Sequence, residues 1–364
     1  MKIYIYFPGE DVHMDGNPYV YTLVDAIVAN HSDVNIACNE DIFWSNKVID
    51  YDVIHIMWPD SLVLWGKVRH TIEELETQLQ MIKTHRIPLV CTCHNLQTHY
   101  KKYKEGIIAY DLVYQNADVF IHLEEYSKQL LSVKYPLARH LIIPHHVYDT
   151  VYTTIPTKEE ALKKLNFKDN QYAISLGAFR NKEERKLFYK IADEFRKYNI
   201  YCIAPAIQIE IPQKTLTLRW IKQCVKKALL RIIHPNVIIN IGYIPNDLIP
   251  YYYALSDISI IQRLEILNSG NVPLGMYFGK VVLGPNVGNV NEIMLKTGNP
   301  TFDVHDLSSI RKACAETVRL TKVNKGQQNR KYALRNWLTE DVAEKTYNLY
   351  MSGNLYFPQP QLNE

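Results

Sequence analysis

Short apolar runs rich in β-branched residues alternate along this chain with longer segments of helical period, and the series occurs twice. Such alternation is typical of βαβ units whose strands form a parallel sheet. The expected strands of the first series are 3–7, 34–37, 53–57, 89–93, 119–122 and 141–143, with helices that include 19–30 and 71–83. Those of the second series are 172–176, 201–204, 237–241, 258–261, 281–284 and 300–302.

A polar, proline-interrupted stretch at 153–158 separates the two series and is typical of a linker. A length of 364 residues also suits two domains, each with its own core. We therefore expect an α/β protein with Rossmann-like domains at 1–155 and 156–339. We expect a C-terminal helix at about 340–356 to pack back on the first domain.

Charge and cysteine content narrow the classes of protein that fit. A net charge of +3 is too small to indicate a nucleic-acid partner. Six scattered cysteines lack the spacing of a zinc site or the density of a secreted disulfide scaffold. The start, 1–8, resembles a first strand more than a signal peptide. We expect a cytoplasmic protein with reduced cysteines.

Two polar turns in the second half carry the features of a phosphate site. Ser269, Gly270 and Asn271 follow a strand and open a short helix, where glycine and free N–H groups favour phosphate oxygens. Gly177 follows another strand and precedes Arg180 and Lys182, which offer a planar fork and a mobile charge. The structural alternatives are an ordinary capped helix at the first turn and ion pairs with Glu183 and Glu184 at the second.

The order of these motifs resembles the donor half of group 1 (family 4) glycosyltransferases of the GT-B class. The matching segments are Gly177, Arg180 and Lys182, 242–245, 256–257, 268–270, 278–282, 284–285, Gly288 and Glu292. In the first half, segments resemble bacterial members that build surface polysaccharides: 15–19, 52–59, 92–95, 117–118 and 143–148. The resemblance implies two facing domains with an interdomain cleft, the first binding an acceptor and the second a nucleotide sugar.

The resemblance also implies roles for individual residues. Arg180 and Lys182 would contact the donor diphosphate, with Gly177, Asn268 and the backbone of Ser269, Gly270 and Asn271 completing the cradle. Gly242, Tyr243 and Ile244 would line the base pocket. The family usually carries two glutamates eight positions apart, but counting back from Gly279 places Ile266 and Leu274 there. Glu265 lies one position from the first place and is the candidate substitute.

The first half supplies the candidates for the acceptor side. His94 follows a strand where the family places a histidine beside the donor sugar, and a neutral imidazole could bind a sugar hydroxyl there. His145 and His146 follow the next strand end, and Asp15, Gly16, Asn17 and Trp58 lie in strand-to-helix turns. The structural alternatives are ordinary polar loop residues, a helix cap at Asn17 and packing of Trp58 under the sheet.

The expected reaction is transfer of a hexose from a UDP- or GDP-linked sugar to a saccharide or lipid-linked saccharide, with retention implied by the family. We expect neither a cofactor nor a metal, because Arg180, Lys182 and the helix N-terminus would neutralise the leaving diphosphate as a metal does elsewhere. One alternative is a nucleotide-sugar 2-epimerase. The other is a catalytically degenerate protein that binds nucleotide or saccharide, as the absent glutamates would permit.

Residues 214–233 form a basic amphipathic helix candidate whose polar positions are nearly all cationic. The structural alternative is a solvated helix packed on its own domain. The functional prediction is peripheral contact with an anionic membrane at the inner face, or with a lipid-linked acceptor.

Overall fold

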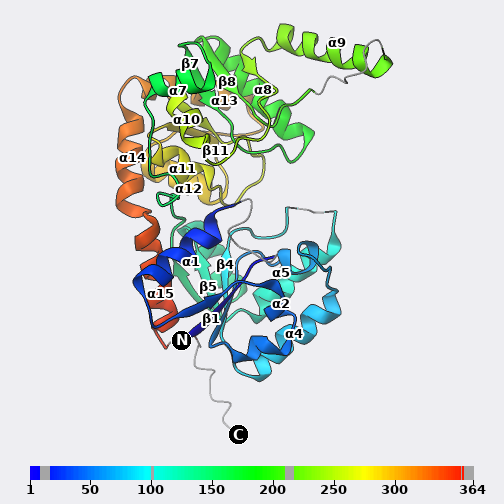
Figure 1. Cartoon of the computed structure of the whole chain (residues 1–364). Helices are drawn as coiled ribbons and strands as arrows, with labels where there is room; N and C mark the ends of the chain where they lie inside the picture. Colours follow the sequence, from blue (N-terminus) through cyan, green and yellow to red (C-terminus); the bar gives the residue numbers. More distant parts are fainter. Residues whose placement is uncertain (9–16, 100–101, 210–216, 354, 356–364) are drawn as a thin grey trace. The chain divides into compact units, whose positions relative to one another are not determined.

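The computed structural model describes residues 1–8, 17–99, 102–209, 217–353 and 355. The chain divides into two compact units (Figure 1). Unit 1 contains Met1–Val151 and Trp337–Glu364, and unit 2 contains Tyr152–Asn336. Each is described below by itself.

Unit 1 is built on a six-stranded sheet of order β2-β1-β3-β4-β5-β6. Its strands are β1 (Lys2–Tyr6), β2 (Asn35–Ala37), β3 (Val53–Ile56), β4 (Leu89–Cys93), β5 (Val119–His122) and β6 (Arg139–Ile142). Its helices are α1 (Tyr19–Asn30), α2 (Glu40–Phe43), the 3-10 helix η1 (Asn46–Asp50), α3 (Ser61–Leu64), α4 (Ile72–Thr84), α5 (Lys104–Asn116), α6 (Glu125–Lys134) and α15 (Thr339–Met351). All its strand pairs are parallel, so the carboxyl ends of the strands share one edge.

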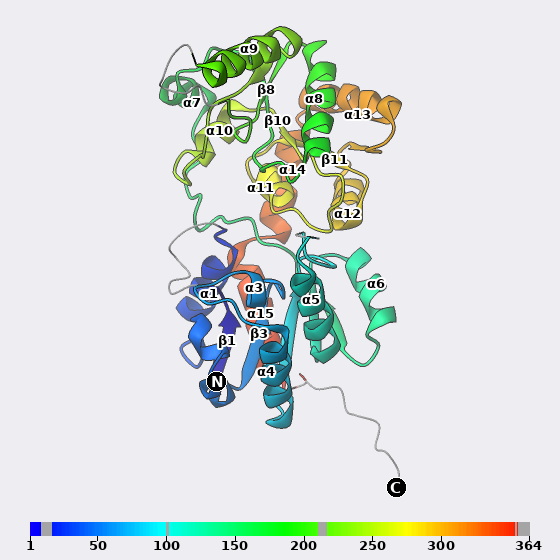
Figure 2. The same cartoon turned by 90° about the vertical axis from the view of Figure 1, so that its right-hand side faces the viewer.

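Helices cover the sheet of unit 1 on both faces. The C-terminal helix α15 packs against α1, and α4 packs against α5 (Figures 1 and 2). A buried bridge ties α15 to the sheet: His55 of β3 lies 2.6 Å through Nδ1 from the Tyr350 hydroxyl and 2.7 Å through Nε2 from Thr92 Oγ1. Burial lowers the pKa of His55 to about 3, so the imidazole is uncharged and this bridge consists of neutral hydrogen bonds.

Unit 2 is built on a second six-stranded parallel sheet, of order β12-β11-β10-β7-β8-β9. Its strands are β7 (Gln171–Ile174), β8 (Ile200–Ile203), β9 (Val237–Ile238), β10 (Ile258–Ile260), β11 (Val281–Pro285) and β12 (Thr301–Phe302). Its helices are α7 (Lys158–Leu165), α8 (Lys182–Arg196), α9 (Leu218–Ile233), α10 (Ile249–Leu255), α11 (Asn271–Tyr277), α12 (Gly288–Thr297), α13 (Leu307–Thr321) and α14 (Lys325–Asn336).

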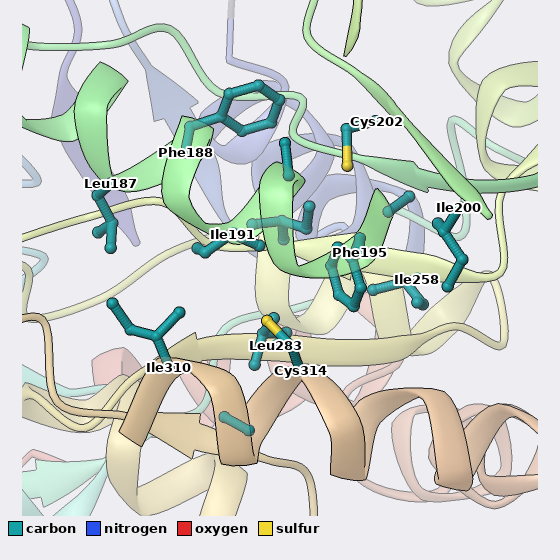
Figure 3. Close-up of a cluster of buried hydrophobic side chains, with 14 of the residues drawn as sticks. Leu187, Phe188, Ile191, Phe195, Ile200, Cys202, Ile258, Leu283, Ile310 and Cys314 are labelled. Carbon is teal, nitrogen blue, oxygen red and sulfur yellow. The ribbon is translucent and has the colours of Figure 1, made fainter. Parts of the chain in front are cut away.

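The core of unit 2 lies where α8 and α13 meet the sheet (Figure 3). Phe188, Ile191 and Phe195 of α8 are fully buried there against strand residues such as Ile258 and Leu283. Their spacing along α8 is the helical repeat that places apolar residues on one face. Because this packing fixes the start of α8 relative to the sheet, it also fixes the loop between β7 and α8.

The alternation of strands and helices expected from the sequence is confirmed in both units, with small differences at strand ends. β6 begins at Arg139, two residues before the expected run, and β9 ends at Ile238 rather than at 241. β9 is short because Asn240 and Gly242 adopt positive φ values of 63° and 83°, which interrupt an extended strand. Among the described helices, none combines the length and apolar character that crossing a membrane requires.

Candidate functional site

The strand order of unit 2 contains a switch point between β7 and β10. With β7 as the first strand, the order reads 3-2-1-4-5-6, and ligands of such sheets bind beyond the carboxyl ends of strands 1 and 4. β7 leads to Gly177 and Arg180, and β10 leads to Gln262 and Arg263. The polar loop singled out by sequence therefore lies at the switch point, beside a second polar loop that sequence analysis did not single out.

Gly177 is surrounded by side-chain nitrogen atoms. A Cβ atom at this position would lie 3.0 Å from Arg263 Nη2 and 3.4 Å from both Asn271 Nδ2 and Gln262 Nε2. Gln262 Nε2 also donates to the Gly177 carbonyl at 2.7 Å. The absence of a side chain at 177 thus lets N–H donors from the loop after β10 and from α11 approach the loop after β7, which is the kind of surface that an anion binds.

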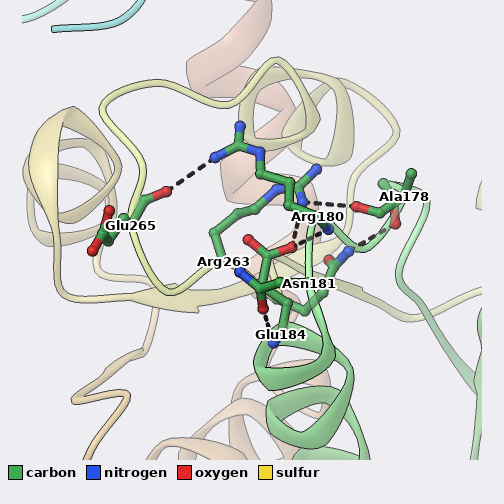
Figure 4. A network of polar contacts seen from close by, with 8 residues as sticks. Ala178, Arg180, Asn181, Glu184, Arg263 and Glu265 are labelled. Carbon is green, nitrogen blue, oxygen red and sulfur yellow. Dashed lines mark hydrogen bonds and ion pairs between the residues drawn. The ribbon is translucent and has the colours of Figure 1, made fainter. Parts of the chain in front are cut away.

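Arg263 is fixed in place by a buried carboxylate (Figure 4). Its Nη1 donates to Glu184 Oε2 and to the Ala178 carbonyl, each at 2.7 Å. Glu184 is 2% exposed, accepts the Arg180 backbone N–H at 2.7 Å and has its own N–H capped by Asn181. One carboxylate therefore orders both the guanidinium of Arg263 and the backbone at Arg180.

The two cations predicted after β7 lie at the same edge and are exposed. Arg180 Nη1 donates to the main-chain carbonyl of Glu265 at 3.1 Å, which spans the β7 and β10 loops. Lys182 is the first residue of α8. The predicted alternative, ion pairs of these cations with Glu183 and Glu184, is not what the structure records for those acids, because Glu183 pairs with Lys186 and Glu184 with Arg263.

The turn at 268–271 is held from the side by the start of α12. Asn289 is fully buried and donates through Nδ2 to Asn268 Oδ1 at 2.7 Å. Gly288 adopts a φ of 56°, and a Cβ there would lie 2.4 Å from the Ile266 carbonyl oxygen, so only glycine permits this approach. We find no hydrogen bond from the backbone N–H groups of Ser269, Gly270 and Asn271 to any other residue that the structure describes.

The places where glutamates were expected are apolar and packed. Leu274 is buried in α11, and Ile266 is half-buried in the loop before it. Glu265 has an exposed side chain, and its described contact to Arg180 uses the main-chain oxygen. The predicted substitution of a carboxylate at 265 for the absent glutamate stays a prediction.

The predicted base-binding segment follows β9. Gly242 has a φ of 83°, and a Cβ on it would lie 3.5 Å from Gln208 Nε2. Tyr243 is 76% exposed and Ile244 is buried. Next to this segment, Gln208 helps to line a hollow with residues from α8, α9 and the loop after β8: Arg185, Tyr189, Ala206, Ile207, Ile209, Lys226 and Leu230.

In unit 1 a cluster of rings occupies the corresponding edge of the sheet. The His94 ring stacks on Trp58 with centroids 4.7 Å apart and receives the Tyr19 ring edge-on at 4.7 Å. Tyr19 also stacks on His146 at 4.7 Å. The structure thus brings together four residues of unit 1 that the sequence singled out, His94, His145, His146 and Trp58, around Tyr19, which it did not.

Hydrogen bonds fix the tautomers of the other two histidines. His146 Nε2 lies 3.2 Å from the Tyr19 carbonyl, which can only accept, so this nitrogen carries the proton. The same reasoning places the proton of His145 on Nδ1, 2.7 Å from the His146 carbonyl. The Tyr148 hydroxyl donates to Asn17 Oδ1 at 3.0 Å and lies 3.3 Å from His145 Nε2. Asn17 Oδ1 also accepts the N–H of Tyr19, the first residue of α1, at 3.1 Å, although Pro18 rather than Asn17 is the N-cap residue of that helix.

The three imidazoles are uncharged at neutral pH. Burial lowers the pKa of His145 to about 4 and that of His146 to about 3. Burial, followed by the neighbouring His145, lowers the pKa of His94 well below its usual value. This edge therefore offers neutral hydrogen-bonding rings, in contrast to the cations of unit 2.

Asp15 and Gly16 lie outside the described residues. In the ranges that the structure does describe, no group of three or more histidine, cysteine or acidic side chains is arranged to hold a metal ion. Sequence analysis gave no role to Arg263, Gln262, Tyr19 or Tyr148, although Tyr19 and Tyr148 end the resembling segments 15–19 and 143–148. One signal could have revealed Gln262 and Arg263: both directly follow the expected strand at 258–261.

No protein-family model and no curated protein sequence matches the chain, whereas solved structures do resemble it. Sucrose-phosphate synthase from Thermosynechococcus elongatus superposes with a TM-score of 0.67 at 12% identity, covering 97% of this chain and 98% of that one. HepE of Anabaena in complex with UDP-glucose gives 0.65 at 13%, covering 97% and 100%. UDP-GlcNAc 2-epimerase from Neisseria meningitidis bound to UDP-GlcNAc gives 0.60 at 13%, covering 97% and 100%. The chain therefore has the two-domain GT-B fold.

Proposed function

We propose that this chain is a glycosyltransferase that takes a hexose from a nucleoside diphosphate sugar and transfers it to a hydroxyl group of a saccharide. The observation that carries the proposal is the convergence of Arg263, Gln262 and Asn271 on Gly177 at the switch point of unit 2, with Arg180 bonded to the Glu265 carbonyl across the same two loops. Several N–H donors aimed at one glycine suit the oxygens of a diphosphate. Similar folds whose solved structures contain UDP-glucose or UDP-GlcNAc support the same class of ligand.

In this proposal unit 2 stabilises the leaving group. The bond from the anomeric carbon to the β-phosphate oxygen breaks, the acceptor oxygen bonds to that carbon, and the departing phosphate takes the acceptor proton. Negative charge then builds on the diphosphate, where Arg180, Lys182 and the ordered Arg263 lower its energy. These cations do the work that a divalent metal does in other enzymes of nucleotide sugars, so we propose a metal-independent reaction without a cofactor.

We assign the recognition of saccharide hydroxyls to the ring cluster of unit 1. A neutral imidazole whose N–H already donates to a carbonyl, as in His145 and His146, keeps a second nitrogen that can accept from a hydroxyl group, and flat rings such as Trp58 pack well on sugars. His94 keeps the catalytic role that the resemblance implies. Asn17, His145 and His146 stay candidates for the acceptor, together with Asp15 and Gly16.

The finer features of the proposal rest on the resemblance. They are a UDP- or GDP-linked donor, retention of anomeric configuration, a saccharide acceptor that is free or lipid-linked, and a place in bacterial surface polysaccharide synthesis in the cytoplasm. A nucleotide-sugar 2-epimerase is the second candidate, because enzymes of that name have the same fold. A binding protein without turnover is the third, favoured by the apolar residues Ile266 and Leu274 at the expected glutamate places.

One assay separates the three candidates. Purified protein is incubated with labelled UDP- and GDP-sugars, with and without an acceptor extract. We expect donor to be consumed and label transferred only when acceptor is present. Isomerisation without acceptor would favour the epimerase, and saturable binding without turnover would favour the binding protein.

A substitution tests the diphosphate site directly. Arg180→Ala should weaken binding of UDP or GDP by about 1.5 to 3 kcal/mol, since charge-assisted hydrogen bonds to phosphate are lost. Titration calorimetry measures the change. The matched control is Lys186→Ala, which removes an exposed cation from α8, the helix that follows Arg180, and should leave affinity unchanged. Equal affinity of the wild type and Arg180→Ala would reject the assignment.

A further inference from the structure

Helix α9 exposes a continuous apolar stripe. Six large apolar side chains recur at helical spacing on one face, with exposed fractions from 45% at Ile221 to 88% at Leu218, and none of the sixteen residues of α9 is buried. The stripe consists of Leu218, Ile221, Val225, Leu229, Ile232 and Ile233. Contiguous apolar patches are uncommon on the surface of soluble proteins and mark interaction sites.

A different face of α9 attaches the helix to unit 2. Trp220, Gln223, Cys224 and Lys227 are half-buried, and Leu230 packs against the core cluster of the unit. With 3.6 residues per turn, these positions lie opposite the stripe. The predicted alternative, a helix that simply packs on its domain, therefore accounts for one face and leaves the apolar one unexplained.

Cations border the stripe on one side. They are Arg219, Lys222 and Lys226, and α9 contains no acidic residue. A second copy of this helix would bring like charges together and would be repelled. An apolar stripe bordered by cations is complementary to a bilayer surface, which offers acyl chains below a layer of anionic phosphate.

We propose that α9 binds the surface of an anionic phospholipid bilayer, with the stripe immersed among the acyl chains and the bordering cations at the phosphates. The helix lies in the plane of the interface over a length of about 24 Å. This surface is separate from the residues assigned to the nucleotide sugar, and the proposal does not depend on which reaction unit 2 serves.

Vesicle sedimentation of the full chain tests the proposal. We expect the wild type to sediment with vesicles of phosphatidylcholine and phosphatidylglycerol, less with phosphatidylcholine alone, and less at high salt, which screens the charges. Arg219→Glu with Lys222→Glu should lower the partition coefficient at least tenfold, since each cation near such a surface contributes about fivefold. Val225→Glu with Leu229→Glu should abolish binding, because carboxylates cannot enter the acyl layer.

Matched controls lie on the same unit. Leu295→Glu changes an apolar side chain that is 67% exposed, and Lys312→Glu with Lys322→Glu reverses two exposed charges on and beside α13. Both should bind vesicles as the wild type does. Absence of wild-type binding, or equal loss in the controls, would overturn the proposal, and so would a wild-type dimer that Val225→Glu with Leu229→Glu dissociates without lipid. Because no nucleotide is present, these results are independent of the calorimetry on Arg180.

Discussion

The carboxyl edge of the sheet in unit 2 carries Arg180, Lys182 and Arg263, whereas the equivalent edge in unit 1 carries His94, His145 and His146. The first edge is ordered by a buried ion pair between Glu184 and Arg263. The second is ordered by ring stacking and by hydrogen bonds between neutral groups. Two sheets of the same architecture thus differ at their carboxyl edges: unit 2 presents charged groups there, and unit 1 presents neutral polar groups.

The difference teaches that sheet topology supplies the position of a site and leaves its chemistry to the loops. In unit 2 the guanidinium of Arg263 pairs with the buried carboxylate of Glu184, so the stability of the unit is expected to be sensitive to removal of either partner. In unit 1 burial keeps three imidazoles neutral, so their stabilising contribution is expected to depend on pH. The predictions below test each half of this contrast.

The largest effect is expected at the ion pair. Glu184→Ala should lower the free energy of unfolding of unit 2 by about 3 kcal/mol. The partly buried guanidinium of Arg263 loses its carboxylate partner, and the Arg180 N–H loses its acceptor. Urea unfolding followed by circular dichroism measures it. Glu183→Ala is the matched control, since Glu183 pairs with Lys186 in solvent and should change stability by less than about 0.5 kcal/mol. Equal effects of the two substitutions would show that the pair does not order this edge.

The next effect is the pH dependence of unit 1. The pKa of His146 lies near 3 in the folded chain and near 6.5 when unfolded, so below pH 6.5 only the unfolded state binds the proton. Stability should therefore fall as the pH falls, with His146 accounting for about 2 kcal/mol of the loss between pH 7 and pH 5. In a Trp220→Phe background every remaining tryptophan belongs to unit 1, and fluorescence reports its unfolding in urea.

His146→Gln isolates this contribution, because glutamine keeps an N–H donor for the Tyr19 carbonyl and cannot take up the proton. The variant should be less stable than the wild type at pH 7 and should show a shallower loss toward pH 5. Parallel pH profiles for the two proteins would mean that His146 is charged, or reaches solvent, in the folded state.

The sequence was sufficient to predict the strands, because short apolar runs rich in β-branched residues, alternating with helical segments, are typical of parallel sheets. It also predicted that Arg180 and Lys182 lie just beyond the carboxyl end of a strand, because both follow the strand and Gly177 within five residues. Arg263 could not be placed in the same way. Its role depends on β10 lying beside β7, and on Glu184 arriving from α8, which are contacts between segments roughly eighty residues apart in sequence.

The histidines of unit 1 show a related limit. Their positions after strands indicated a site, but neither tautomer nor charge could be read from the sequence. Both follow from the carbonyls of Tyr19 and His146 and from the depth of burial. The end of β9 was missed for a local reason, since the apolar run continues through Ile239 and Ile241 while Asn240 turns the backbone to positive φ.

The smallest effect is expected from the hydrogen bonds of the neutral edge. Tyr148→Phe removes the hydroxyl that donates to Asn17 and approaches His145, and it should lower the unfolding free energy of unit 1 by about 1 kcal/mol, the usual contribution of a buried neutral hydrogen bond. Tyr347→Phe removes a hydroxyl bond to Asp33 at the surface and should cost less. Because the neutral edge distributes its stability over several weak contacts, no single one should match the ion pair of unit 2. A loss at Tyr148 as large as that of Glu184→Ala would contradict the contrast between the two edges.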